Sequence, residues 1–290
     1  MFHVHDAGDL DAPDTLRLLD DDAGSLVEVV PSRGALVTRF RAGEREVLYL
    51  DRATLLDRTK NVRGGIPVLF PIAGRLTGDA WRSPRGPRTL KQHGFARNLP
   101  WSVVERVADD HSARVTLGLE ATDETLAVFP WPFHARIAFE LRAATLAITA
   151  TFAHDGESPM PVHFGFHPYF TVLQADKRGA SIETDATRAF DNTTKTTGPL
   201  GVIDLTRDEV DLHLLDHRAP STRLRTPDGR AARIDLDPIF STVVAWTLAG
   251  KDFVCLEPWS APADALNTGV GLARVDPGET LRARFSITAE

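Results

Sequence analysis

Short runs in which polar and apolar residues alternate, each bounded by turn-forming residues, dominate this sequence. Typical runs are Trp101–Val107 (WSVVERV), Phe133–Leu141 (FHARIAFEL) and Thr242–Leu248 (TVVAWTL). Alternation with a period of two is typical of a β-strand that buries one face. Asp22–Ser25 and Asp228-Gly229 lie between such runs and predict hairpin turns. Because turn signals recur about every 8 to 12 residues, the pattern predicts an all-β fold, either a sandwich or a barrel.

Helical signals are sparse. The best candidate is Asp123–Val128, which Pro130 should end because proline lacks the N–H that a helix interior needs. The 290-residue chain shows no Gly/Ser-rich linker, no internal repeat and no break in composition. Since all-β domains of this length occur as single units, we expect one domain of antiparallel sheets that spans residues 1–290.

The composition narrows the classes of partner. The chain has a formal charge of −7 and no long block of like charges, which argues against non-specific binding to nucleic acid. No apolar run approaches the roughly 20 residues of a membrane helix, and the N-terminus does not resemble a signal peptide. We therefore expect a cytoplasmic protein that binds neither nucleic acid nor membrane. The single cysteine, Cys255, lies in the apolar run FVCL and is interpreted as an inert buried thiol.

The segment Val162–Phe170 (VHFGFHPYF) places two histidines in an apolar run. Gly165 and Pro168 oppose a helix, and in a strand residues an even number apart share a face. We expect a polar face opposite an aromatic face that packs on the core: His163, Gly165, His167 and Tyr169 against Phe164, Phe166 and Phe170. Gly165 would leave room for a ligand or a second backbone. These residues alone leave packing, metal binding and proton transfer open for the two histidines.

Metal binding is one of these alternatives. His93, His163, His167 and Glu257 are residue types that bind metals and could converge in the fold. However, the sequence has no HExxH, no CxxC and no histidine pair followed by a glutamate at cupin-like spacing. We therefore expect no metal site, and a metal-dependent, cupin-like enzyme is a weaker hypothesis.

Glu257 stands out among the carboxylates. It follows the apolar run FVCL and precedes Pro258 and Trp259. Burial beside a tryptophan disfavours the charged carboxylate, which raises its pKa and makes it a better base near neutral pH. The ring of Trp259 also offers an apolar face to a sugar. A structural salt bridge is the alternative for Glu257, and no second carboxylate in a comparable setting supports a glycosidase.

Three arginines, Arg63, Arg75 and Arg97, lie in regions that break the strand alternation. The planar guanidinium group suits carboxylates, phosphates and sugar hydroxyls. Any one of them, taken alone, is more often a solvated or structural residue. Three in motif-like settings indicate an oxygen-rich ligand.

Four motif-like segments follow one another along the chain: Arg63–Leu76 (RGGIPVLFPIAGRL), Gln92–Trp101 (QHGFARNLPW), Phe164–Phe170 (FGFHPYF) and Cys255–Gly269 (CLEPWSAPADALNTG). Together and in this order they resemble the galactose-mutarotase-like superfamily, which comprises aldose 1-epimerases and the related hexose-6-phosphate mutarotases. The resemblance implies a single large antiparallel β-sandwich, the supersandwich of that family, with a sugar site on its concave face. It also implies interconversion of α and β anomers without a metal or a cofactor.

The resemblance also implies roles for individual residues. His167 resembles the family's general acid and Glu257 its general base. His93 and Arg75 resemble residues that hold the ring and hydroxyl oxygens of the sugar, and Arg63 resembles an arginine of the hexose-6-phosphate branch. Three more residues complete the expected substrate contacts: Arg97, Trp259 and Asp211, the last being the nearest match to an acidic residue that contacts sugar hydroxyls.

The sequence thus predicts an aldose 1-epimerase that acts on an aldohexose or a hexose 6-phosphate, as a monomer or a homodimer. GRL after the FP segment resembles the free-sugar or LacX-like branch, whereas RGGIP resembles the phosphosugar branch. The alternative from another class is a non-catalytic carbohydrate-binding or regulatory protein of the same fold. Only the enzyme requires His167 and Glu257 to lie close together across a sugar-sized gap. His163 matches no catalytic residue, so we expect it to pack or to support the site.

Overall fold

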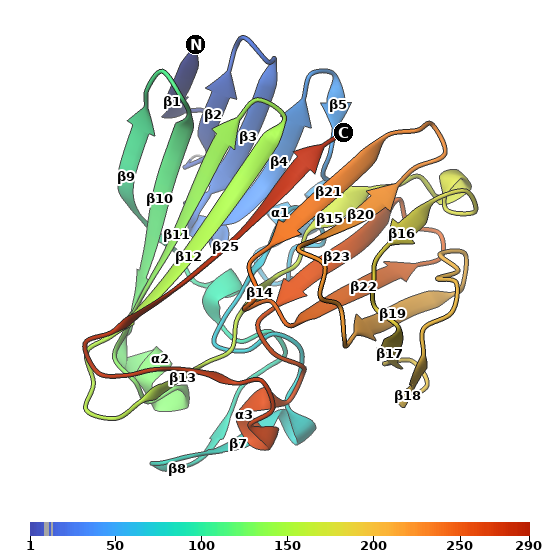
Figure 1. Ribbon diagram of the computed structural model, residues 1–290. Coiled ribbons are helices and arrows are strands. Elements are labelled where there is room, and N and C mark those ends of the chain that lie inside the picture. The colour runs from blue at the N-terminus through green and yellow to red at the C-terminus, as the bar shows by residue number, and fades with distance from the viewer. Residues whose placement is uncertain (9–11, 13) are drawn as a thin grey trace.

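Three β-sheets dominate the computed structural model, which describes residues 1–8, 12 and 14–290 (Figure 1). The N-terminal sheet follows the order of the chain: β1 (Phe2–Asp6), β2 (Leu16–Asp20), β3 (Ser25–Val30), β4 (Leu36–Ala42) and β5 (Arg45–Glu46). Each of these strands is antiparallel to the next. The turn between β2 and β3 falls within one residue of the predicted hairpin turn at Asp22–Ser25.

The long sheet has eight strands, and its middle strands are ten residues long. Its order is β16 (Ser181–Glu183), β20 (Ser221–Arg225), β21 (Ala231–Leu236), β25 (Thr280–Ala289), β12 (Thr145–His154), β11 (Phe133–Arg142), β10 (Ala113–Glu120) and β9 (Ser102–Ala108). β11 buries alternate residues from Phe133 to Leu141, as its sequence pattern predicts. β20 and β21 form the hairpin predicted at Asp228-Gly229, where Gly229 has a φ of 83°.

The second eight-stranded sheet, called the pocket sheet below, is built from shorter and less regular strands. Its order is β18 (Thr196–Pro199), β17 (Arg188–Asp191), β19 (Glu209–Leu214), β22 (Thr242–Leu248), β23 (Phe253–Trp259), β14 (Gly165–Phe166) and β6 (Val68–Leu69), with β15 (Tyr169–Thr171) also paired to β23. Its strand pairings in the described residues are antiparallel. All-β architecture with antiparallel sheets is therefore confirmed.

Smaller elements connect the sheets. The described residues include two two-stranded sheets, β7 (Ala80–Ser83) with β8 (Gly86–Thr89) and β13 (Met160–Val162) with β24 (Ala273–Val275). They also include the short helices α1 (Arg52–Leu56), α2 (Asp123–Val128) and α3 (Ala265–Thr268), and the 3-10 turns η1 (Pro31–Arg33), η2 (Thr77–Asp79), η3 (Ala96–Asn98) and η4 (Gln174–Asp176). α2 has the predicted bounds. It begins after Thr122, whose hydroxyl accepts the N–H of Thr125, and ends at Val128, two residues before Pro130.

The strand β9 departs from the predicted pattern of a single buried face because it is exposed on both faces. In β9, six of the seven residues are exposed, including Val103 and Val104. β9 is the last strand of the long sheet, and the exposure of its side chains shows that little packs on either of its faces. Alternation therefore identified the strand correctly, but the burial of its apolar residues depends on a covering layer that β9 lacks.

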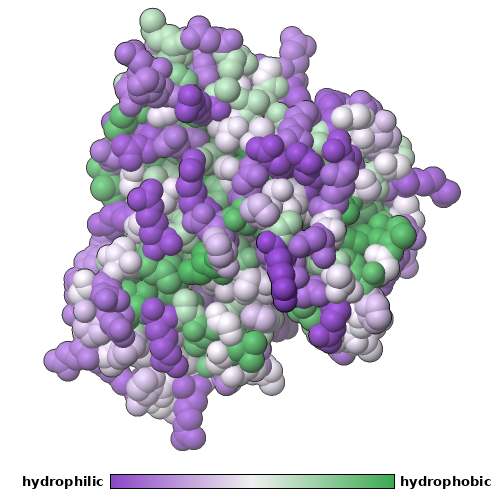
Figure 2. Space-filling view, in the orientation of Figure 1, coloured by the Kyte–Doolittle hydropathy of each residue, from purple (hydrophilic) through white to green (hydrophobic). Residues whose placement is uncertain are grey.

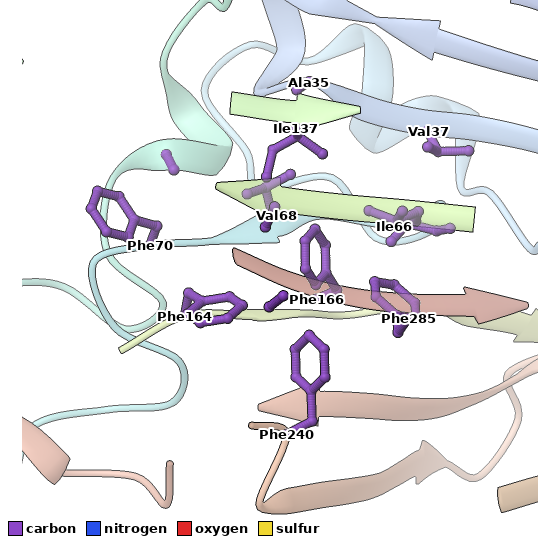
Figure 3. Close-up of a cluster of buried hydrophobic side chains, with 14 of the residues drawn as sticks. Ala35, Val37, Ile66, Val68, Phe70, Ile137, Phe164, Phe166, Phe240 and Phe285 are labelled. Carbon is purple, nitrogen blue, oxygen red and sulfur yellow. The ribbon is translucent and has the colours of Figure 1, made fainter. Parts of the chain in front are cut away.

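The sheets form two layers around a continuous core. Two bridges join the N-terminal part of the chain to the pocket sheet and its flanking residues: Val37 of β4 with Ile66, and Leu48, just after β5, with Phe170 of β15. The long sheet covers both, and Phe166 of β14 lies 4.8 Å from Phe285 of β25, ring centre to ring centre. Figure 3 shows this aromatic cluster between the strands, where Phe240 packs on Phe164 and Phe166. The three phenylalanines of the Val162–Phe170 segment thus face the core, as predicted.

The surface is mainly polar on the face shown in Figure 2, where hydrophobic residues occur in scattered patches. In the part of the chain that the structure describes, no helix has the length and apolar character needed to cross a membrane.

Candidate active site

A cavity of about 780 Å³ opens on the pocket sheet and is lined by strands and loops that are distant in the sequence. The structure places all eight sequence-predicted site residues around it: Arg63, Arg75, His93, Arg97, His167, Asp211, Glu257 and Trp259. The pocket sheet supplies His167, Asp211, Glu257 and Trp259 from β19, β23 and the link between β14 and β15. The remaining residues come from the loops that broke the strand alternation.

Strand register explains why these side chains converge. Glu257 and Trp259 are two residues apart on β23 and therefore share a face. Glu257 is paired with Val244 of β22, which is paired in turn with His213 of β19. His213 and Glu257 thus stand in one row across three neighbouring strands.

Among the eight predicted site residues, His167 and Glu257 make the shortest contact between ionisable groups. Nε2 of His167 lies 3.2 Å from Oε1 of Glu257, and the side chains are only 9% and 3% exposed. Burial raises the pKa of Glu257 well above its usual value, and the nearby charge of Asp211 adds to this effect. Burial, with Arg97 nearby, lowers the pKa of His167 to about 3. The distance suits an ion pair, but both pKa shifts favour the uncharged forms. We therefore place the proton that lies between the two groups on the carboxyl of Glu257, beside a neutral His167.

Trp259 fixes the other oxygen of Glu257. Its indole Nε1–H donates to Oε2 of Glu257 at 3.1 Å. Two glycines allow the ring to lie there: a Cβ on Gly165 would come within 2.7 Å of the Trp259 ring, and a Cβ on Gly74 within 2.9 Å. Gly165, which was expected to admit a ligand or a second backbone, therefore makes room for this ring and for the carbonyl of Pro258, 2.9 Å from the same Cβ position.

His93 faces the cavity from a backbone turn with a φ of 67°. Its Nδ1 accepts the backbone N–H of Gly74 at 3.0 Å, so the proton of the neutral ring sits on Nε2. Burial, followed by the charge of Arg97, holds the pKa of His93 well below its usual value. The ring centre lies 5.6 Å from that of His167, which makes His93 a neutral hydrogen-bond donor beside the proton-sharing pair.

The three arginines differ in how firmly they are held. Arg97 donates to the carbonyl of Gln92 at 2.8 Å, and burial lowers its pKa. Arg63 lies with its guanidinium carbon 5.9 Å from the ring centre of Trp246. The side chain of Arg75 is 66% exposed and reaches Asp79 only at 3.7 Å. Arg97 is thus part of the cavity wall, whereas Arg75 and Arg63 remain freer to meet a ligand.

Asp211 is a second carboxylate in the cavity, with a different environment from Glu257. Its Oδ2 accepts the side-chain N–H of Asn192 at 2.7 Å, and its Oδ1 lies 3.3 Å from Nε2 of His213. Burial by itself raises the pKa of Asp211, but the contacts with His213 and Asn192 outweigh it and leave the pKa below its usual value. Asp211 is therefore an ionised acceptor.

Sequence reasoning missed several residues that line the cavity: Asn61, Gln92, Asn192, Lys195, Glu209, His213 and Trp246. His213 had a usable signal, because it follows Asp211 by two residues in a predicted strand and must share its face. Asn192 and Lys195 lie at the turn between β17 and β18 and belong to none of the four motifs. Tyr169, expected on the polar face, also lines the cavity and stacks on His167 at 4.6 Å.

The prediction that His163 shares a polar face with His167 is wrong. The segment is not one continuous strand, since β13 ends at Val162 and β15 begins only at Tyr169. His163 is fully buried outside the cavity lining, and its Nε2 donates to the carbonyl of Ala261 at 3.0 Å. Burial lowers its pKa to about 4. The alternative interpretation of His163 as a packing residue agrees with this environment.

One group of potential metal ligands occurs among the described residues. Ligand atoms of His167, Cys255 and Glu257 lie within 4.8 Å of one another. Metals bind the thiolate form of cysteine, whereas burial and then the charge of Glu257 raise the pKa of Cys255 well above its usual value. These surroundings suit proton exchange between His167 and Glu257 better than a resident metal.

Comparisons with known proteins agree with the fold and the motifs. The family model for aldose 1-epimerase matches residues 16–288. The crystal structure of the Slr1438 protein from Synechocystis is 36% identical, covers 100% of this chain and 99% of its own, and superposes with a TM-score of 0.93. Protein LacX of Lactococcus lactis is 25% identical over 78% of this chain and 85% of its own.

A Salmonella typhimurium protein, proposed to be a glucose-6-phosphate 1-epimerase, is 28% identical over 130 residues. That match covers 45% of this chain and 40% of the length of the Salmonella protein. The family match extends over nearly the whole sequence, and the antiparallel sheets and the four motif segments agree with it. The chain therefore belongs to the aldose 1-epimerase family of isomerases.

Proposed function

We propose that this protein is a mutarotase, which interconverts the α and β anomers of an aldohexose or a hexose 6-phosphate. The observation that carries the proposal is the contact of 3.2 Å between His167 and Glu257, two buried proton-exchanging groups at the wall of a cavity of about 780 Å³. General acid–base catalysis needs two such groups within reach of the reacting atoms. Family membership supports the same reaction class.

The reaction needs one proton taken up and one released at each step. Glu257 as carboxylate removes the proton from O1 of the cyclic sugar, while His167 as imidazolium protonates the ring oxygen O5. The C1–O5 bond breaks and the open aldehyde forms. After rotation about C1–C2, the O5 hydroxyl returns its proton to His167 and attacks the other face of C1, while Glu257 returns its proton to O1.

The altered pKa values suit this exchange. The raised pKa of Glu257 and the lowered pKa of His167 reverse the usual order of the two groups, so the proton between them rests on the carboxyl before the sugar binds. Their contact lets one proton move from Glu257 to His167, which produces the reactive carboxylate–imidazolium state. Each group then gives and takes a proton once during one anomer exchange, as general acid–base catalysis in both directions requires.

Neighbouring residues bind and orient the sugar in this proposal. His93 offers its Nε2–H, and Arg97 and Arg75 offer guanidinium N–H groups to the ring and hydroxyl oxygens. Asp211 accepts hydrogen bonds from sugar hydroxyls, and Trp259 presents its ring beside Glu257.

The choice between a free and a phosphorylated sugar depends on the cations at the cavity rim. Arg63 and Lys195 both line the cavity, and each suits a phosphate group. One relative is proposed to act on glucose 6-phosphate, and the motifs combine features of both branches. We propose a hexose 6-phosphate as the first substrate to test.

The alternative is a carbohydrate-binding or regulatory protein without catalysis. It would keep Arg75, Trp259 and the cavity, but it has no use for two proton-exchanging groups in contact. The test is a panel of freshly dissolved aldoses and hexose 6-phosphates, followed by polarimetry or NMR exchange. Accelerated exchange for at least one sugar is expected. Sugar binding without acceleration for any sugar would favour the alternative.

We further propose that residues 1–290 form one domain, because a single hydrophobic cluster includes residues of all three sheets. Cytoplasmic location and a monomeric or homodimeric state stay predictions, which fractionation and sedimentation would test.

A further inference from the structure

A second histidine–carboxylate pair faces the same cavity, and the acid–base scheme does not use its histidine. Asp211 and His213 are two residues apart on β19 and share one face. The side chain of His213 is 6% exposed, and its Nε2 lies 3.3 Å from Oδ1 of Asp211. Because an ionised carboxylate can only accept, the ring nitrogen that faces Oδ1 must carry the proton.

Both oxygens of Asp211 are held from the side of the protein. Oδ1 meets His213, and Oδ2 accepts the amide N–H of Asn192 at 2.7 Å. Asn192 is itself fixed, since its backbone N–H donates to the Asp211 carbonyl at 2.8 Å and its Oδ1 accepts Nζ of Lys195 at 2.6 Å. An ionised carboxylate has about four acceptor positions, so each oxygen keeps one position for a ligand.

The ring of His213 has little freedom to turn. Its centre lies 5.1 Å from that of Trp259 and 5.6 Å from that of Phe190, both edge-to-face. Phe190 is also its partner in the neighbouring strand β17. Aromatic neighbours on two sides hold the imidazole in the plane from which Nε2 meets Asp211.

We infer, on the basis of the proposed function, that His213 is a positioning residue that fixes Asp211 as a two-oxygen acceptor for two neighbouring hydroxyl groups of the sugar. A carboxylate held at both oxygens cannot rotate to follow a single hydroxyl. It selects a ligand that presents two donors side by side, as adjacent ring hydroxyls do. Such selection acts on sugar binding and leaves the proton transfers at C1 to His167 and Glu257.

A competing explanation would make His213 merely structural. Its ring contacts Trp259, whose Nε1–H donates to Glu257. If His213 mattered only through this route, its loss would disturb the base and lower kcat. If it acts through Asp211, its loss weakens sugar binding and leaves kcat nearly unchanged.

Three substitutions separate these explanations. His213→Phe keeps an aromatic ring beside Trp259 and Phe190 but removes the N–H. His213→Asn is shorter and cannot reach Asp211, and it serves if the phenylalanine variant fails to fold. His213→Gln carries an amide nitrogen close to the position of Nε2 and restores the donor. We expect KM for the preferred sugar to rise about tenfold in the first two variants, with kcat within threefold of wild type, and to recover largely in the third.

A series of monodeoxy analogues of the preferred sugar tests the two-hydroxyl part of the inference. In the wild type, removal of either of two neighbouring hydroxyls should raise KM about tenfold or more. In Asp211→Ala both penalties should disappear, and in His213→Phe or His213→Asn both should shrink at least threefold, while penalties at other positions persist. A packing defect would leave the pattern of penalties unchanged.

Three outcomes would overturn the inference. The first is a fall in kcat without a rise in KM, and the second is a KM for His213→Gln as high as that for His213→Asn. The third is a set of deoxy-sugar KM increases that is the same in the wild type and in the His213 variants. Failure of the proposed function is recognised separately, because the wild type would then accelerate no sugar at all. If the wild type is active and the His213 variants have the same KM and kcat as the wild type, only the role of His213 is rejected.

Discussion

The cavity contains two histidine–carboxylate pairs of nearly equal separation and opposite character. Nε2 of His167 lies 3.2 Å from Glu257, and Nε2 of His213 lies 3.3 Å from Asp211. Yet the pKa of Glu257 is raised and that of Asp211 is lowered. Distance therefore does not decide what such a pair can do.

Burial and hydrogen bonding explain the difference. The Glu257 side chain is 3% exposed and receives one hydrogen bond, from Trp259. The Asp211 side chain is 19% exposed and is contacted by donors at both oxygens. Hydrogen bonds to the charged form stabilise it, whereas burial without enough of them destabilises it. After burial, the negative charge kept on Asp211 adds to the raised pKa of Glu257.

The largest expected effect follows from removal of the base. Glu257→Gln keeps the shape of the side chain but cannot take up a proton. We expect kcat for anomer exchange to fall at least about hundredfold, the lower bound for a general acid–base group, with an unchanged circular dichroism spectrum. Polarimetry on the preferred sugar measures the rate. A near-wild-type rate would show that Glu257 is not the base.

His167→Ala should cause a loss of similar order, about 10² to 10⁴ in kcat. His167 lies in contact with Glu257, so the double variant should lose little more than either single one. Multiplicative losses in the double variant would mean that the two residues act independently. NMR exchange spectroscopy resolves rates over this range.

Asp211→Asn, the matched change in the second pair, should act on binding instead. It removes the charge that accepts from the sugar, and we expect KM to rise about tenfold or more, as for one charged hydrogen bond of about 1.5–3 kcal/mol. The value of kcat should change much less than in Glu257→Gln. A fall in kcat as large as that of Glu257→Gln would erase the distinction between the two pairs.

His163 offers a control for burial without catalysis. Its pKa in the folded state, about 4, lies below the usual value of 6.5. Because the folded pKa is lowered, the stabilisation is present above pH 6.5 and is lost as the pH falls toward 4. Between pH 7 and pH 5 this residue alone should reduce the free energy of unfolding by about 2 kcal/mol.

Urea denaturation at the two pH values measures that loss. In His163→Gln the decrease should be smaller by about this amount, and anomer exchange should continue at pH 7. An identical pH dependence in both proteins would mean that His163 is not protonated on unfolding in this range.

The smallest expected effect concerns the rim of the cavity. Arg63→Ala should raise KM for a hexose 6-phosphate about tenfold, as for loss of one charge-assisted contact, and alter KM for the free sugar little. Parallel KM measurements on both sugars test this. Equal effects on the two substrates would reject a phosphate-binding role for Arg63.

Particular residues show how far sequence reasoning reached. The alternation in Phe133–Leu141 predicted a half-buried strand, and the phenylalanines after Val162 predicted a core-facing wall; both agree with the structure. Glu257 attracted attention because an apolar run and a tryptophan flank it, and it lies buried against that tryptophan. The same alternation failed for His163, because the chain leaves the strand at His163 and Phe164, between β13 and β14.

The sequence by itself determined which segments form strands and which aromatic residues are buried, because these depend on local periodicity and on residue chemistry. The resemblance to the family implied which motif residues gather at the site. The tertiary structure alone decided how the two carboxylates differ. The register of β19, β22 and β23 sets His213, Val244 and Glu257 in one row, and the turn after β17 brings Asn192 to Asp211. Burial and hydrogen-bond partners arise from these long-range pairings, and they set the proton affinities on which the proposed chemistry depends.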